Sequence, residues 1–196
     1  MLKRIFDFVL AFIGLLILLP FFIVIAICIK LSSKGSVFYF QQRTGKNEIP
    51  FLLFKFRTMV IDADKKGLLT VGMTDNRITK VGYSLRKYKM DELPQLLNVL
   101  NGTMSLVGPR PEVEKYTKLY NAEQKRVLSV KPGITDFASI KYRNENEILA
   151  NFENPEKGYI EQVMPDKLKL NLEYISNRNI WMDIKIIFAT LFKIAI

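Results

Sequence analysis

The 196-residue sequence contains no histidine and a single cysteine, Cys28. Without histidine there is no Ser-His-Asp triad, no histidine acting as general acid or base, and no histidine-ligated zinc. One cysteine forms neither a disulfide framework nor a thiolate metal cluster. Any catalysis therefore depends on carboxylates, lysines, tyrosines or a metal ion bound by oxygen.

Acidic residues are scarce relative to basic ones, with 19 Asp and Glu against 29 Lys and Arg and a formal net charge of +10. Such an excess indicates an anionic partner. Nucleic acid, anionic lipid and phosphorylated substrates all carry the required charge. The basic residues are scattered rather than interleaved with aromatic residues in a recognisable nucleic-acid module, which disfavours DNA or RNA.

Charge is missing altogether from residues 8–29, a run of uncharged and mostly apolar positions with Pro20 near its middle. About 20 helical residues cross a ~30 Å hydrocarbon core, so the run is long enough to span a membrane. A proline in a helix interior removes a backbone donor and kinks or breaks the helix. A sharp break would give two half-helices, residues 8–19 and 20–29, each too short to cross alone.

Basic residues flank this run on both sides, with Lys3 and Arg4 before it and Lys30 and Lys34 after it. Hydropathy alone fits a kinked spanning helix equally well. Cytoplasmic flanks attract Lys and Arg, so charge on both sides favours a re-entrant hairpin that returns to the cytoplasm. A signal peptide fits poorly, because the run exceeds the usual ~7–15 residues. We therefore expect residues 1–34 to be a re-entrant membrane segment and residues 35–196 to be one cytoplasmic domain packed on the membrane surface.

The remaining sequence predicts an α+β fold. Strands are expected over residues 36–43 and 51–58, joined by turn residues 44–47 as a hairpin. In the second strand Lys55 and Arg57 share a face, which we interpret as a solvated edge in preference to a phosphate-facing surface. The last helix carries apolar residues on one broad face and suits a membrane interface. One helix is expected to begin near residue 60, and four others to cover residues 91–100, 111–128, 166–177 and 180–195. Residues 134–142 are expected to be either a strand or irregular.

The adjacent acids Asp91 and Glu92 are the best catalytic candidates. Carboxylates are stabilised at helix N-termini, so a capping role is the simpler interpretation of the pair alone. The many cations around them suit phosphoryl chemistry instead, in which cations neutralise oxygen charge while a carboxylate attacks or holds Mg²⁺. These cations are Lys55, Arg57, Arg86, Lys87, Lys89 and Arg110.

Two shorter patterns bear on how phosphate could be bound. Arg110 lies between Pro109 and Pro111, which stiffen the loop that presents it. Asp62-Ala63-Asp64 is similar to the DxD metal motif of nucleotide-sugar glycosyltransferases, but it falls where a helix is expected to begin, and we interpret it as a solvated helix start. No stretch matches a Walker A motif or a dinucleotide fingerprint.

Six blocks of residues are spread over nearly the whole chain. They are Lys3-Arg4-Ile5-Phe6-Asp7 before the apolar run, Gln42-Arg43-Thr44-Gly45, Phe54-Lys55-Phe56-Arg57-Thr58-Met59, Asp91-Glu92-Leu93-Pro94-Gln95, Met104-Ser105-Leu106-Val107-Gly108-Pro109-Arg110-Pro111 and Lys131-Pro132-Gly133-Ile134-Thr135. In this order the blocks resemble the bacterial sugar transferase family, the monotopic phosphoglycosyl transferases. The chain looks like the minimal form of the family, without the extra membrane domain of larger relatives.

The resemblance implies the reaction: a sugar 1-phosphate moves from a UDP-sugar to polyprenyl (undecaprenyl) phosphate and UMP is released. It implies that Asp91 is a nucleophile that forms a covalent aspartyl-phosphosugar intermediate, and that Glu92 helps to hold Mg²⁺. Lys55, Arg86 and the Pro109-Arg110-Pro111 loop would contact the phosphates or the uridine. Arg143 aligns as a further substrate contact.

The resemblance also implies a setting. The enzyme would be monotopic in the bacterial inner (cytoplasmic) membrane, with its active site facing the cytoplasm, and would catalyse the first membrane step of surface-glycan assembly. In relatives a cation before the apolar run pairs with an acid in the C-terminal helix; here Lys3 or Arg4 would pair with Asp183, and Arg4 is our choice. The resemblance leaves open whether the protein forms a homo-oligomer.

Departures from the family concern sugar recognition. Many relatives carry Gly-Trp-Ala-Gln-Val and then Gly-Arg-Asn, where this chain has residues 136–140 and then 142–144. Residues 145–165 form a longer stretch than in many small relatives, and Asn171 stands where many relatives carry Asp.

Two other functions compete with this one: a membrane-anchored basic protein that only binds anionic lipid or nucleic acid, and a transferase without a covalent intermediate. The paired acids and the Pro-Arg-Pro loop speak for an enzyme.

Overall fold

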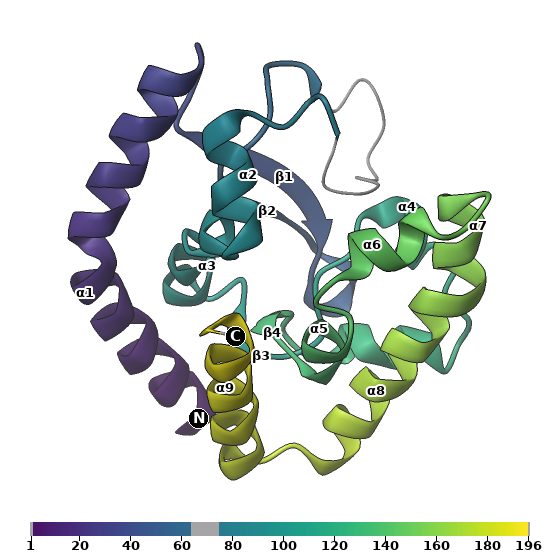
Figure 1. Cartoon of the computed structure of the whole chain (residues 1–196). Coiled ribbons are helices and arrows are strands. Elements are labelled where there is room, and N and C mark those ends of the chain that lie inside the picture. Colours follow the sequence, from purple (N-terminus) through teal and green to yellow (C-terminus); the bar gives the residue numbers. More distant parts are fainter. Residues whose placement is uncertain (1, 64–74, 196) are drawn as a thin grey trace.

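The computed structural model describes residues 2–63 and 75–195. Its first element is helix α1 (Leu2–Ser32), which continues through Pro20, so two separate half-helices are not formed. Figure 1 shows α1 bent about halfway along its length, as the loss of a backbone hydrogen bond at an internal proline explains. By length and composition α1 could cross a membrane: its most apolar stretch has a mean hydropathy of 3.2, and 6% of that stretch is buried.

Strands β1 (Phe38–Thr44) and β2 (Pro50–Phe56) pair antiparallel, from Phe38 opposite Phe56 to Thr44 opposite Pro50. The expected hairpin is therefore confirmed. The interpretation of its two cations as a solvated edge is wrong, because Arg57 is 7% exposed and the Lys55 side chain 16%. Both side chains find partners outside the hairpin, which the alternation of one strand does not reveal.

A second, parallel pair joins β3 (Ser105–Val107) to β4 (Gly133–Thr135). It brings together two loops that lie far apart in the sequence. Residues 134–142 thus begin in a strand and continue into helix α5. The helices after the hairpin are α2 (Lys80–Lys87), α3 (Gln95–Asn101), α4 (Glu114–Thr117), α5 (Phe137–Lys141), α6 (Glu145–Ala150), α7 (Pro155–Gly158), α8 (Met164–Asn177) and α9 (Ile180–Ala195).

The two C-terminal helices agree with the sequence, but three other expectations need correction. The helix expected over residues 111–128 is two short pieces, α4 and a 3₁₀ turn (Gln124–Ser129), because the Asn121 side chain accepts from Gln124 N and starts a new turn. The helix expected from residue 91 begins only at α3, behind the 3₁₀ turn Met90–Glu92. Where a helix was expected to begin near residue 60, residues 60–62 are not helical, Ala63 has 3₁₀ conformation, and Asp64 lies outside the described residues.

Helix α1 touches the rest of the protein near its two ends. Its buried residues are Asp7 and Ala11 at one end and Ile25 and Ile29 at the other. Ala11 packs with residues of β2 and α3, while the two isoleucines pack with residues of β2 and α2. None of residues 12–24 is buried. The middle of the helix therefore stands away from the domain, as Figure 1 shows.

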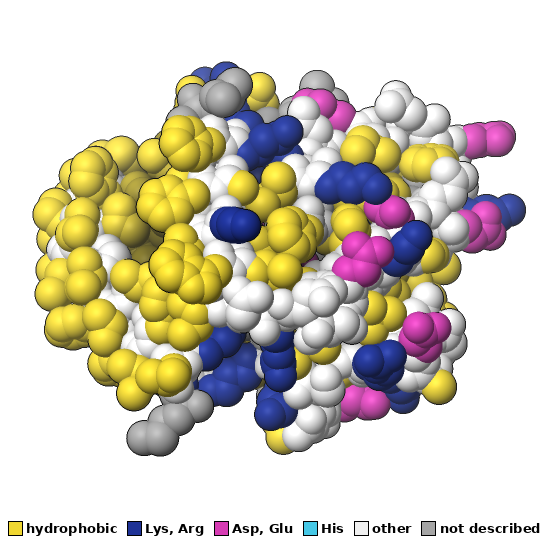
Figure 2. Space-filling view, turned by 90° about the horizontal axis from the view of Figure 1, so that it is seen from below, with side chains coloured by type: hydrophobic (Ala, Val, Ile, Leu, Met, Phe, Trp, Pro, Cys, Tyr) yellow, Lys and Arg dark blue, Asp and Glu magenta, His cyan; other side chains and the backbone are white. Residues whose placement is uncertain are grey.

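Exposed apolar side chains continue from α1 onto α9. Trp181, Phe188, Leu191 and Phe192 are all more than half exposed. Figure 2 shows the lower face of the protein with hydrophobic side chains gathered on the α1 side and Lys, Arg, Asp and Glu on the other. A water-exposed apolar surface of this kind marks a contact with lipid or protein.

Candidate active site

The acids Asp91 and Glu92 lie in the 3₁₀ turn that follows α2. Lys89, just before them, has a φ of 55°, a left-handed conformation that costs a non-glycine residue roughly 1–2 kcal/mol. Such strain persists only where the surrounding structure imposes it, and it is frequent at functional sites. The chain is therefore turned sharply at the point where it presents the two carboxylates.

Helix α2 is fixed against the end of the β-hairpin. The Thr79 hydroxyl accepts from Gly82 N at 2.9 Å and caps the helix. A Cβ added to Gly82 would lie 2.0 Å from the Thr58 carbonyl oxygen, so only glycine permits this approach. Arg86, in the last turn of α2, is thereby brought to the cavity that Asp91 lines.

Glu92 is held by two cations. Arg110 donates to both of its carboxylate oxygens, with Nη1 3.0 Å from Oε2 and Nη2 bound to Oε1, and Lys55 Nζ lies 3.2 Å from Oε1. Burial alone would raise the pKa of Glu92, but the charges of Arg110 and Lys55 hold that pKa well below its usual range. Glu92 is therefore a mostly covered carboxylate that stays ionised.

Asp91 has the opposite environment. It is 8% exposed, and no hydrogen bond or ion pair within the described residues holds its carboxylate. Burial, followed by the negative charge of Glu92, raises the pKa of Asp91. Two adjacent carboxylates whose pKa values are pushed apart indicate two different roles. Asp91 keeps its oxygen lone pairs for another atom, whereas Glu92 uses its own on cations.

The loop that carries Arg110 is fastened by backbone contacts between β3 and β4. Gly108 N donates to Thr135 O at 3.1 Å, and Gly133 N donates to Pro109 O at 3.0 Å. A Cβ on Gly133 would lie 2.1 Å from Gly108 N, so the close crossing requires glycine. The negative charge of Glu92 in turn raises the pKa of Arg110.

The fully buried Asp136 fixes the same loop from the other side. Its carboxylate accepts from Arg110 N at 3.2 Å and from Ser139 N at 2.6 Å, which caps α5. One acid thus ties the arginine loop to α5, whose C-terminal end leads to Arg143. The position of Arg110 is set by the backbone as well as by Glu92.

The structure brings most of the candidate residues to one cavity of about 1350 Å³. A cavity of this size exceeds the ~300–1,000 Å³ usual for one small ligand. Cations supply much of its polar wall, which suits a ligand with phosphate groups. The candidates that line it are Lys55, Arg86, Asp91, Glu92, Arg110 and Arg143.

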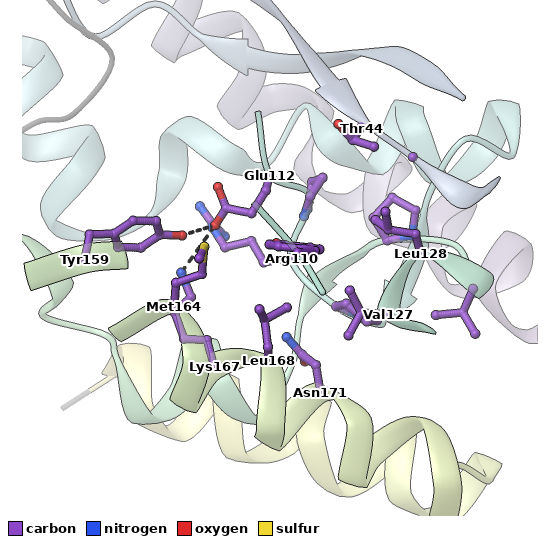
Figure 3. A pocket seen from close by; sticks show the side chains of 16 residues that line it. Thr44, Arg110, Glu112, Val127, Leu128, Tyr159, Met164, Lys167, Leu168 and Asn171 are labelled. Carbon is purple, nitrogen blue, oxygen red and sulfur yellow. Dashed lines mark hydrogen bonds and ion pairs between the residues drawn. The ribbon is translucent and has the colours of Figure 1, made fainter. Parts of the chain in front are cut away.

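Pro109 and Pro111 line a different, much smaller cavity behind Arg110. Figure 3 shows it, with the carboxylate of Glu112 facing Tyr159 and Lys167. Its volume of about 20 Å³ suits a single water molecule and is far too small for a sugar nucleotide. The two prolines therefore shape the loop and do not face the large cavity.

Comparison with known proteins assigns the chain to a family. The sequence model described as "Bacterial sugar transferase" matches residues 1–196. The chain belongs to this family.

Individual members of the family show the same relationship. The chain is 40% identical over 198 residues to UDP-glucose:undecaprenyl-phosphate glucose-1-phosphate transferase of Escherichia coli (strain K12), covering 98% of this chain and 40% of the relative. It is 40% identical over 196 residues to the uncharacterized sugar transferase EpsL of Bacillus subtilis (strain 168), covering 100% of this chain and 88% of that protein. A third relative is UDP-N-acetylgalactosamine-undecaprenyl-phosphate N-acetylgalactosaminephosphotransferase of Aeromonas hydrophila. It is 33% identical over 194 residues, covering 96% of this chain and 42% of that protein. The chain thus spans about two fifths of the length of several curated relatives that it matches.

In this sugar transferase chain, sequence reasoning missed a second ionic cluster behind the cavity. Glu112 binds Tyr159 and lies 3.7 Å from Arg43 and 3.6 Å from Lys167. Lys167 Nζ also lies 2.8 Å from Glu145. Burial alone would raise the pKa of Glu112, but the charges of Lys167 and Arg43 lower it. Arg43 stands in the Gln-Arg-Thr-Gly block, the one signal that could have pointed to this cluster.

The anchoring pair differs from the sequence-based choice. Lys3, not Arg4, lies against Asp183, with Nζ 2.8 Å from Oδ2. Arg4 instead donates to the carbonyl oxygens of Val99 and Leu100 at the end of α3. Successive residues of a helix point about 100° apart, so one faces α9 and the other α3.

Proposed function

We propose that this chain transfers a sugar 1-phosphate from a UDP-sugar to polyprenyl (undecaprenyl) phosphate and releases UMP through a covalent aspartyl-phosphosugar intermediate. The observation that supports this most is the contrast between the two acids: Glu92 is bound by two cations, while Asp91 has no such partner and faces the cavity. The names of the E. coli and A. hydrophila relatives describe reactions of this class.

In the first step an Asp91 carboxylate oxygen attacks the phosphorus that carries the sugar. A new O–P bond forms, and the bond from that phosphorus to the oxygen bridging the two phosphates breaks. UMP leaves with the bridging oxygen and its electron pair. Arg86, Arg110 and Lys55 line the cavity and would neutralise the charge on the pyrophosphate. Burial raises the pKa of Asp91, which makes the deprotonated carboxylate more basic and so a better nucleophile.

In the second step a phosphate oxygen of the polyprenyl phosphate attacks the same phosphorus. The bond to the Asp91 oxygen breaks and the carboxylate is regenerated, while the sugar leaves on a polyprenyl diphosphate. Both steps transfer a phosphoryl group between oxygens, so no oxidant, reductant or histidine is required. Arg143, two residues after the end of α5, lines the cavity, which supports a contact between its side chain and the transferred group.

Asp91 and Glu92 are also the residues that would hold Mg²⁺. No cluster of three or more metal-binding side chains occurs in residues 2–63 and 75–195. Mg²⁺ commonly binds one or two protein carboxylates and completes its shell with substrate phosphates and water, which two adjacent acids fit. Both Glu92 oxygens already accept hydrogen bonds from Arg110, so the Asp91 oxygens are more available as ligands for the ion. When bound, the ion would neutralise phosphate charge.

The membrane topology proposed here is re-entrant, with the active site on the cytoplasmic face of the bacterial inner membrane. Both ends of α1 are held by the same domain. At the N-terminal end Asp7 accepts from Ser105 Oγ at 2.8 Å; at the C-terminal end Arg57 donates to the carbonyl oxygens of Ser33, Lys34 and Ser36. A helix that crossed the bilayer would leave its ends on opposite sides, where one domain could not bind both.

The experiment that tests the proposed function measures UMP release by the protein in lipid nanodiscs across a panel of UDP-sugars. Each sugar is tested with and without undecaprenyl phosphate, and with and without a chelator of divalent cations. The proposal expects turnover with the acceptor, one equivalent of UMP or less without it, and loss of both on chelation. The absence of UMP for every sugar would favour a basic membrane-binding protein. Turnover with the acceptor but no UMP without it would favour direct transfer.

A further inference from the structure

One wall of the large cavity is formed by α5 and the start of α6. Every residue from Ser139 to Ile148 lines the cavity that Asp91 also lines. In Figure 1 the two helices lie between α8 and the middle of the protein. Arg143, for which a contact with the transferred group is proposed, stands in the middle of this stretch. We call residues 139–148 the α5–α6 wall.

The α5–α6 wall is fastened to α8 by charged and polar contacts. Lys141 Nζ lies 2.7 Å from Asp166 Oδ2, and the Tyr142 hydroxyl donates to the same oxygen at 2.7 Å. Lys167 Nζ lies 2.8 Å from Glu145 Oε2. These contacts hold the wall in position. They also occupy the polar groups of Lys141, Tyr142 and Glu145, which are therefore less available to a ligand.

Ser139 carries a buried hydroxyl group that has no hydrogen-bond partner in residues 2–63 and 75–195. Its backbone N–H donates to Asp136 Oδ1 at 2.6 Å, and Oδ2 of the same carboxylate accepts from Arg110 N at 3.2 Å. Asp136 thus fixes the position of Ser139 relative to the arginine loop. Buried polar groups are nearly always hydrogen-bonded, so an unpartnered hydroxyl in a cavity wall indicates a partner that enters through the cavity.

Asn146 and Glu147 add an amide and a carboxylate to the same wall. Both line the cavity, and neither side chain has a hydrogen bond or an ion pair within the part of the chain that the structure describes. Asn146 is half-buried and Glu147 is exposed, so Glu147 lies at the rim of the cavity. Hydroxyl, amide and carboxylate groups together offer hydrogen-bond donors and acceptors to a ligand rich in hydroxyl groups.

A neutral sugar is the part of a UDP-sugar that matches this wall. The sugar is bonded to the phosphorus that Asp91 attacks, so the side chains on either side of Arg143 are the ones near it. The uridine lies beyond the bond that breaks, because the attacking and leaving oxygens are in line. Glu147 attracts hydroxyl donors but repels a sugar that carries its own carboxylate. Lys141 does not offset this charge, since Asp166 already neutralises it.

We propose that Ser139, Asn146 and Glu147 bind the sugar ring of the UDP-sugar and select a neutral sugar over an acidic one. The proposal rests on the proposed function, since it names the class of sugar that is transferred at the same site.

The wild-type protein offers a test that does not depend on the folding of variants. In nanodiscs with undecaprenyl phosphate, kcat/KM is measured for UDP-glucose, UDP-galactose, their N-acetylamino forms and UDP-glucuronic acid. The best neutral sugar should exceed UDP-glucuronic acid by about fivefold or more, the effect of two like charges ~4 Å apart in water. An equal or higher value for UDP-glucuronic acid overturns the proposal, whereas no UMP release from any UDP-sugar refutes the proposed function.

Two variants with matched controls assign this selection to the wall. Ser139→Ala removes only the unpartnered hydroxyl, so Tm should be unchanged or higher while kcat/KM for the best sugar falls by about twofold to tenfold. Its control is Ser176→Ala, at an exposed position of α8. Glu147→Gln should raise kcat/KM for UDP-glucuronic acid, relative to the best neutral sugar, by up to about fivefold. Its control is Glu153→Gln, the same charge change at an exposed position outside both cavities.

Inhibition by UDP separates recognition of the sugar from recognition of the nucleotide. The inhibition constant of UDP should stay unchanged in Ser139→Ala and Glu147→Gln, because UDP lacks the transferred sugar. If UDP inhibition weakens by the same factor as kcat/KM for every sugar, the wall binds the nucleotide and the proposal is overturned. A value of kcat/KM for Ser139→Ala, or a sugar preference for Glu147→Gln, that matches the control of that variant also overturns it.

Discussion

Replacing Arg110 with lysine tests whether the cavity depends on a two-pronged contact or only on positive charge. Arg110 donates to both oxygens of Glu92, while a lysine ammonium presents a point charge and replaces one contact at best. A hydrogen bond to a charged group contributes roughly 1.5–3 kcal/mol. In a chain of this length each kcal/mol shifts Tm by about 2–4 °C. We therefore expect Arg110→Lys to lower Tm by roughly 3–12 °C and to reduce UMP release.

The assay is thermal unfolding in nanodiscs, with Lys115→Ala as the matched control. Lys115 pairs with Glu156 on the surface, and an exposed pair contributes only about 0–1 kcal/mol. A double-mutant cycle of Arg110→Lys with Glu92→Gln should show a coupling of about 1 kcal/mol or more. A Tm loss no larger than that of Lys115→Ala, or strict additivity in the cycle, would refute the claim that this pair organises the site.

Three further predictions concern the nucleophile, the anchor and the membrane. UMP release without acceptor should fall as pH decreases, with a midpoint above the ordinary aspartate pKa of ~3.9, because only the carboxylate of Asp91 attacks and burial raises its pKa; a midpoint at or below ~3.9 would contradict this. Asp183→Ala should cost roughly 1–3 kcal/mol and lower the yield in membranes, because the Tyr174 hydroxyl loses its closest acceptor and Lys3 keeps only Asp7, at 3.5 Å; an unchanged Tm counts against it. Single cysteines at positions 2 and 34, in a Cys28→Ser background, should both resist an impermeant thiol reagent applied to intact cells, and labelling at one of them would indicate a spanning helix.

The elements that the sequence predicted correctly are those determined by local patterns. The β-hairpin follows from β-branched and aromatic residues on either side of turn residues, and α8 and α9 follow from apolar periodicity. The end of α3 also follows from a local signal, because a glycine after the last helical residue is typical of a C-terminal cap. Gly102 has this role, with a φ of 86°. In each case the determining residues lie within a few positions of one another.

Features that depend on distant residues could not be predicted in this way. Lys55 is mostly covered because Glu92 binds it from another element, which strand alternation does not show. Residues 111–128 have a helical composition, yet Asn121 caps a new turn and divides the segment. The partner of Asp183 depended on which of two adjacent cations faces α9, a question of helix rotation that only packing decides. The two acids, by contrast, could be proposed from the basic residues around them in the sequence, and their roles stay a prediction.

Mass spectrometry of the intact protein after incubation with UDP-sugar, without lipid acceptor, tests the central claim most directly. The account predicts an added mass equal to one phosphosugar, located on the peptide that contains Asp91. The adduct should disappear when undecaprenyl phosphate is added, and it should be absent in Asp91→Asn, whose amide is too weak a nucleophile to form the ester. An adduct on another residue, or UMP release by Asp91→Asn at the wild-type rate, would contradict the assignment of Asp91 as the nucleophile.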